Sequence, residues 1–185
     1  MTLGTSWYEA AAAGPLAQGE LVFGCPVPRV EGYRFPFDEN QSIEVVYDTH
    51  ELVVLSQSCD LENDKVDEVL LAAVHPYKTL VTQEGERNPT VNSTKWRKAV
   101  ARGSEPAYSL LPPHDEAPVF DWSLVDFHHL FTLPKTFLVD VTSLAPVRLR
   151  LVPPYREHLA QAFARYVMRV GLPDSLVEFE GYKVS

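Results

Sequence analysis

Short apolar runs, separated by turn-forming residues and not by helices, dominate the first half of the sequence. The runs fall at 19–28, 43–48, 51–57 and 67–77. The third run, ELVVLSQ, is dense in β-branched residues, as a strand buried on both faces would be. Between the runs, 29–41 and 58–65 are polar or rich in proline and glycine, so we expect loops there. Strands that follow one another without helices predict a small barrel or a sandwich.

The rest of the chain alternates between polar segments and short elements. Its 185 residues suit one domain with a sizeable core, since 45% of them are hydrophobic. Residues 6–13 predict a short helix. Residues 78–103 form a polar insertion with one helix, for which Ser93 is the N-cap and Gly103 the C-terminal stop. Residues 104–150 are rich in proline and aromatic side chains and predict further strands, one of them at TFLVDV.

The clearest periodicity in the sequence belongs to a predicted C-terminal helix at 154–170. Its apolar side chains recur every 3.6 residues and form one stripe: Tyr155, Leu159, Ala162, Phe163, Tyr166, Val167 and Val170. Pro154 suits the first turn of this helix, and Gly171 suits its C-cap. We expect the stripe to pack on the β-rich core. Arg165 and Arg169 lie four residues apart on the other side and are candidate binding residues for an anion or a partner.

The overall charge limits the class of partner. The chain has a formal net charge of −9, whereas proteins that bind nucleic acid mainly through phosphates need a basic surface. RNA is therefore disfavoured as a partner, and another protein, or a second copy in a homodimer, is the better expectation. The sequence contains no long apolar run and no N-terminal signal pattern, so we expect a cytoplasmic protein without a membrane partner.

The segment SQSCDL (56–61) places a thiol and a carboxylate where a strand is expected to end. A nucleophilic cysteine needs a neighbouring cation, but the neighbour of Cys59 is the acidic Asp60. We therefore expect a packed cysteine, with Asp60 in the turn and available for binding. An enzyme centred on Cys59 remains an alternative.

A zinc site is a further alternative, with ligands from both cysteines and two histidines. The candidates are Cys25, Cys59, His75 and one of His50, His128 or His129. These residue types suit tetrahedral zinc, but their spacing matches no zinc motif. We expect His128 and His129 to chelate poorly together, because adjacent side chains of a strand point to opposite faces. No metal and no cofactor are therefore predicted.

Three segments follow the order and character of the strands in one known family. They are GELVF (19–23), ELVVLSQ (51–57) and EVLLAAVHP (68–76). In these features the N-terminal half resembles the MazF/PemK family of toxin-type endoribonucleases. The resemblance implies an α+β, mainly β fold. It would be a small SH3-like, PemK-like β-barrel at 19–77 with the C-terminal amphipathic helix packed on it.

The residues that carry the family's chemistry are not matched in this chain. The family uses an arginine just before its central strand, where this chain reads Thr49-His50-Glu51. It uses a Thr or Ser at the end of the next strand, where this chain reads Val74-His75-Pro76-Tyr77. The resemblance therefore implies a non-catalytic barrel that acts as a protein-binding or regulatory module in a bacterial toxin–antitoxin or defence system. An active endoribonuclease is the alternative, with His50 and His75 as its acid/base pair and an arginine of the last helix on the phosphate.

Overall fold

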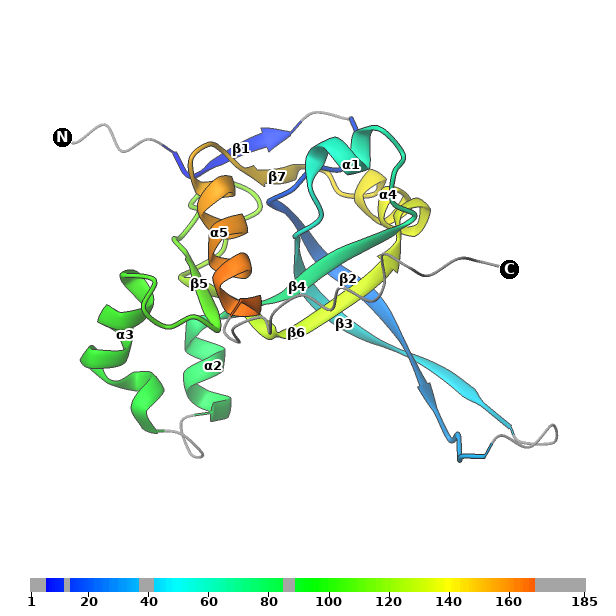
Figure 1. Ribbon diagram of the computed structural model, residues 1–185, viewed down its shortest axis with the longest axis horizontal. Coiled ribbons are helices and arrows are strands. Elements are labelled where there is room, and N and C mark those ends of the chain that lie inside the picture. The colour runs from blue at the N-terminus through cyan, green and yellow to red at the C-terminus, as the bar shows by residue number, and fades with distance from the viewer. Residues whose placement is uncertain (1–5, 12–13, 37–41, 85–88, 169–185) are drawn as a thin grey trace, which may run out of the picture.

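A seven-stranded antiparallel sheet organises the chain (Figure 1). The computed structural model describes residues 6–11, 14–36, 42–84 and 89–168. The strands are β1 (Tyr8–Ala11), β2 (Glu20–Glu31), β3 (Glu44–Val54), β4 (Glu68–Pro76), β5 (Tyr108–Leu111), β6 (Ser123–Pro134) and β7 (Arg148–Leu151). Their order across the sheet is β1-β7-β2-β3-β4-β6-β5.

The prediction of an α+β, mainly β fold is confirmed, but the predicted SH3-like barrel is not. β1 and β5 end the strand order and do not pair with one another among the described residues, so the sheet is not closed. Five helices accompany it: α1 (Ser58–Glu62), α2 (Tyr77–Glu84), α3 (Thr94–Ala101), α4 (Lys135–Ser143) and α5 (Tyr155–Val167). A 3-10 turn at Pro89–Asn92 joins α2 to α3. No helix among the described residues is long and apolar enough to cross a membrane.

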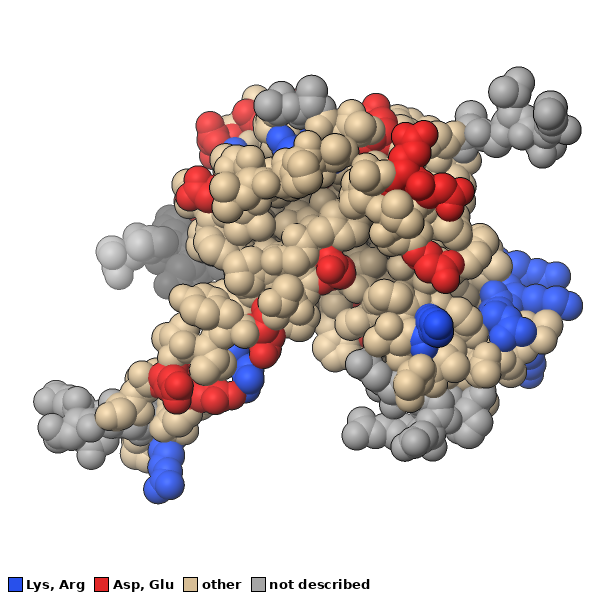
Figure 2. Space-filling view, turned by 180° about the vertical axis from the view of Figure 1, so that it is seen from behind, with Lys and Arg blue, Asp and Glu red and all other residues tan. Residues whose placement is uncertain are grey.

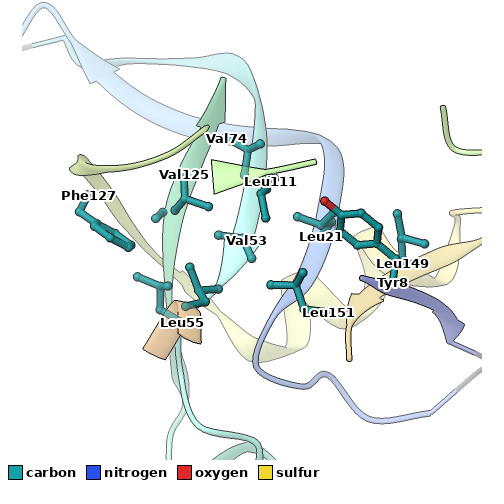
Figure 3. Close-up of a cluster of buried hydrophobic side chains, with 12 residues drawn as sticks. Tyr8, Leu21, Val53, Leu55, Val74, Leu111, Val125, Phe127, Leu149 and Leu151 are labelled. Carbon is teal, nitrogen blue, oxygen red and sulfur yellow. The ribbon is translucent and has the colours of Figure 1, made fainter. Parts of the chain in front are cut away.

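Buried side chains cover both faces of the central strands, as the ELVVLSQ run predicts. Val53 and Leu55 belong to one apolar cluster (Figure 3), whereas Leu52 and Val54 belong to a second cluster on the other face. Alternation along β3 produces this division, since successive side chains of a strand point to opposite sides. The sheet is thus the shared wall of two small cores.

The amphipathic C-terminal helix packs on the first of these clusters, as predicted. Leu159 is buried, and four more residues of the stripe pack against the cluster: Tyr155, Ala162, Phe163 and Tyr166. Val167 is exposed. Arg169, Val170 and Gly171 lie outside the described residues.

Local signals also predict the middle helix correctly. Ser93 is the N-cap of α3, and its hydroxyl accepts a hydrogen bond from the backbone N–H of Trp96 at 3.1 Å. Gly103, just beyond the helix, has a φ of +64°, which glycine adopts without steric cost. Two further helices, α1 and α2, were not predicted.

Two predictions of secondary structure type are wrong. Residues 8–11 form β1 and not a helix, because β1 pairs with β7 and Tyr8 is buried with its hydroxyl donating to Pro112 O at 2.8 Å. TFLVDV lies in α4 and not in a strand, because this segment buries Leu138 completely in the second cluster. In both segments tertiary packing overrides a weak local propensity.

The boundary predicted near residue 49 is also wrong. The runs at 43–48 and 51–57 were interpreted as two strands, but β3 continues from Glu44 to Val54. The first half of β3 pairs with the end of β2, which itself extends to Glu31, into the segment expected to be a loop. These paired ends form a two-stranded ribbon that projects from the body (Figure 1). We call residues 25–31 and 44–50 the arm.

Candidate functional site

A hollow of about 540 Å³ on the sheet gathers four of the six histidines of the chain. Its lining residues come from β3, β4 and β6, from the start of β5 and from α2. Its polar lining consists of His50, His75, Tyr108, Asp126, His128 and His129. Ala73, Leu80 and Phe131 complete the wall.

A bulge of three residues in β6 creates this grouping. The adjacent β4 residues Ala72 and Ala73 pair with Leu130 and Asp126, so the three β6 residues in between leave the ladder. The bulge frees His128 and His129 from strand alternation, and both imidazoles turn back toward Asp126. The expectation that these adjacent histidines point to opposite faces is therefore wrong.

Asp126 is the centre of the cluster and is almost completely buried. Its Oδ1 accepts a hydrogen bond from the backbone N–H of His128 at 2.9 Å and lies 3.1 Å from Nδ1 of the same residue. Its Oδ2 lies 2.8 Å from His129 Nδ1 and 4.0 Å from His75 Nε2. Among the described residues, no lysine or arginine pairs with this carboxylate. A buried carboxylate is costly unless a positive group compensates its charge.

His75 does not provide that compensation at neutral pH. Burial lowers the pKa of His75 below its ordinary value of 6.5, and His129 and His50 lower it further, although Asp126 opposes the shift. His75 is therefore a neutral imidazole at pH 7, with a lone pair that a proton does not occupy. Histidine binds a metal only in its unprotonated form, so a neutral His75 beside a buried carboxylate is compatible with a bound cation.

Three side chains of the cluster have the geometry of a metal site. One ligand atom each from His75, Asp126 and His129 lie within 4.8 Å of one another. Ligand atoms about 2.0–2.2 Å from one ion are at most about 4.4 Å apart, so a small closure of the three side chains would be enough. His128 approaches the other carboxylate oxygen of Asp126 and lies outside this group of three.

The lowered pKa of His75 has a consequence for stability. Because the unfolded chain binds this proton more tightly than the folded chain, we expect the metal-free protein to lose stability as pH falls below 6.5. His75→Gln should lose less stability over the same range. Urea unfolding at pH values above and below 6.5, in the presence of a chelator, measures the difference. The same pH dependence in both proteins would contradict this expectation.

The structure brings together the two histidines predicted as an acid/base pair. His50, on β3, and His75, on β4, line the same hollow, and the His50 ring lies 4.9 Å from that of Phe131. Their catalytic role stays a prediction.

The other predicted site residues lie away from the hollow. Arg165 is exposed, and its guanidinium lies against Gly103, where a cation is favoured by the C-terminal end of α3. Arg169 lies outside the described residues. Asp60, on α1, is partly exposed, and its Oδ1 lies 3.7 Å from Lys65 Nζ. The structure therefore does not join these three residues into one site.

Neither cysteine contributes to the cluster. Cys25 is buried in the second core, and burial, together with the charge of Glu51, raises its pKa to about 11. The expectation that Cys59 is packed is wrong, because Cys59 is exposed on α1. Its Sγ lies 3.7 Å from Gln57 Oε1 and 3.8 Å from Asp60 Oδ1. Among the described residues, no group with metal-binding geometry contains a cysteine.

Sequence reasoning missed Asp126, and it set His129 aside as a joint ligand. The run Asp126-Phe127-His128-His129 was the available signal, since it places three ligand-type residues within four positions. A regular strand separates them onto two faces, and only the bulge reunites them. Comparison with known proteins adds no further guide: no protein-family model matches this chain, and no curated protein matches its sequence.

Proposed function

We propose that this chain is a metal-dependent hydrolase whose ion is a divalent transition metal held by His75, Asp126 and His129. One observation carries the proposal. A buried carboxylate with no lysine or arginine partner among the described residues lies within reach of two histidine nitrogens, at the bottom of an open hollow. A metal ion would supply the positive charge that compensates the Asp126 carboxylate, and the unprotonated nitrogen of His75 would bind the same ion.

The kinds of ligand narrow the choice of ion and the class of site. Imidazole and carboxylate together suit zinc and the neighbouring first-row metals. Three protein ligands leave a coordination position for water or substrate, which is the pattern of catalytic and not of structural zinc sites. A metal at such a position lowers the pKa of bound water to near 7 and makes it a nucleophile. This proposal departs from the sequence-based expectation of no metal.

Two side chains of the hollow have the chemistry to assist such a reaction. His50 and Tyr108 both line the hollow outside the ligand group. An imidazole in that position suits general acid/base work on the attacking water or the leaving group. We therefore assign His50 to proton transfer and keep His75 as a ligand.

Metal titration tests the ligand assignment. We expect the protein purified without chelator to hold about one ion per chain, and His75→Ala to weaken Co²⁺ binding by more than about 100-fold, since losing a second-shell partner alone costs 10–100-fold. His158→Ala is the matched control, because His158 is exposed on α5 and far along the chain from the cluster. Equal affinity in the two variants would contradict the ligand assignment.

Hydrolysis of model esters tests the second half of the proposal. The metal-loaded protein should cleave a phosphodiester or carboxylic ester, and His50→Ala should lower the rate while metal stoichiometry stays unchanged. Metal binding without hydrolysis of either substrate class would refute the hydrolase assignment and leave the ion site intact.

The function implied by the resemblance stays a separate prediction. It is a non-catalytic, SH3-like module that binds a protein partner in a toxin–antitoxin or defence system. The exposed apolar residues of the arm support a protein partner. The endoribonuclease alternative would use the same hollow through His50 and His75.

A further inference from the structure

The arm is a two-stranded ribbon without neighbours on either side. β2 pairs with β7 only at Glu20 and Leu21, and β3 pairs with β4 only from Leu52 to Val54. Beyond these points the two strands pair only with each other, as far as Glu31 and Glu44. The base of the arm packs on the body, since Cys25 and Val27 are buried in the second cluster, whereas its outer part stands clear of the body at the lower left of Figure 2. A lone two-stranded ribbon is at best marginally stable in water, and three or more strands are needed for independent stability.

The two faces of the arm differ in character. Cross-strand partners share a face, and the pairs Pro28–Tyr47 and Val30–Val45 make one face apolar. The other face carries Arg29, whose Nε donates to Asp48 Oδ2 at 2.8 Å. Tyr47 is 67% exposed and Val45 54%. An amphipathic ribbon that leaves its apolar side in water indicates an interaction surface.

The prolines decide which edge of the arm is able to pair. Pro26 and Pro28 have no backbone N–H, so they occupy positions where an N–H would point away from β3. The outer edge of β2 therefore lacks two donors and is protected against pairing. Thr49 and Tyr47 pair with these two prolines, so their backbone groups also point away from the partner strand. Their N–H and C=O groups, with those of Val45, point outward from β3, and no strand of the described residues pairs with them there.

We propose that a second copy of this chain pairs along the free edge of β3. The two β3 strands would run antiparallel about a two-fold axis at Tyr47, giving a four-stranded ribbon with order β2-β3-β3-β2. This register joins outward-facing groups to outward-facing groups: Tyr47 to Tyr47, and Val45 to Thr49 of the second copy. It also uses the whole free edge, whereas a register centred on Thr49 would collide with the pairing of Leu52 to β4.

Hydrogen-bonding complementarity of the facing side chains favours a second copy as the occupant. In this register Glu44 lies opposite His50 of the second copy, so a carboxylate faces an imidazole at both ends of the pairing. Tyr47 and Val45 pack against side chains of the second copy, which reduces the exposure of the apolar face. Because His50 lines the hollow, Glu44 of the second copy would lie beside the proposed metal site.

Sedimentation of the full chain tests the proposal with a matched pair of variants. Val45 and Val30 pair with each other across the arm, and the backbone N–H of each points away from the partner strand. Val45→Pro removes one donor per chain from the β3 edge, and the two-fold axis doubles the loss. We expect dimerisation about 30-fold weaker, from about 1 kcal/mol for each hydrogen bond. Val30→Pro adds a proline to the already blocked β2 edge and should leave the dimer unchanged.

Cross-linking provides a second test that does not depend on weakening the arm. Residues of a hydrogen-bonded antiparallel pair have Cα atoms about 5.5 Å apart, within the range of a disulfide. In a Cys59→Ser background, Tyr47→Cys should form a covalent dimer on mild oxidation. Val119→Cys, at a site that is 71% exposed, should not. A monomeric wild type, equal dimerisation in both proline variants, or no cross-link through Tyr47→Cys would each overturn the proposal, independently of metal binding.

Discussion

We expect Asp126→Asn to abolish metal binding and to leave the metal-free protein at least as stable as the wild type. The amide has the shape of the carboxylate, and its oxygen can still accept the hydrogen bond from His128 N. The substitution removes a buried negative charge that no lysine or arginine partners among the described residues. Removing such a charge relieves its desolvation cost. An ion, in contrast, loses the one anionic ligand of its site.

Thermal unfolding with and without zinc measures both effects. At a free ion concentration of about 100 times Kd, the wild type should gain about 2.7 kcal/mol of stability. Asp126→Asn should gain almost nothing. Asp121→Asn is the matched control, because Asp121 lies on the same segment of chain but is exposed. If Asp126→Asn destabilised the metal-free protein by several kcal/mol, the carboxylate would be structural and the metal proposal would fail.

Glu20→Ala has the largest expected effect on folding. Glu20 is fully buried at the start of β2, and its Oε1 accepts a hydrogen bond from Arg148 Nε at 2.6 Å. Its Oε2 accepts from Arg150 Nη2 at 3.1 Å and from Ala17 N at 3.2 Å. The side chain thereby joins β7 to the segment that precedes β2. Truncating it leaves two guanidinium groups, 11% and 20% exposed, without their carboxylate.

Breaking a buried pair costs about 3–5 kcal/mol because an uncompensated charge remains inside the protein. Urea unfolding should show a loss of about this size for Glu20→Ala. Asp48→Ala is the comparison, because it breaks the ion pair with Arg29. Both side chains of that pair are about half exposed, so the substitution should cost less than about 1 kcal/mol. Similar losses in the two variants would contradict the burial argument.

Local patterns in the sequence predicted those elements whose cause is local. The period of 3.6 residues located α5, and the polar Ser93 followed by a glycine stop located α3. The apolar run through Val53 indicated a strand buried on both faces. Each of these signals lies within one element, so no knowledge of distant contacts was needed.

The strand β1 and the helix α4 depend on distant partners. β1 is a strand because β7, more than 130 residues later in the chain, pairs with it. α4 is a helix because this conformation buries Leu138 in the second apolar cluster of the sheet. Intrinsic helix and strand preferences amount to at most about 1 kcal/mol per residue, so over segments as short as these they yield to tertiary packing.

The candidate site follows the same division. His50 and His75 were singled out from the sequence because they lie near the positions at which the resembled family has its arginine and its Thr or Ser. The sequence alone also determined the acidic charge and the absence of a recognised metal motif. Only the tertiary structure decided that a bulge in β6 turns His129 back to a buried Asp126, and that β4 brings His75 to the same carboxylate. A metal site is a set of distances between strands, and register, which sets those distances, depends on pairing across the sheet and not on the order of residues along one strand.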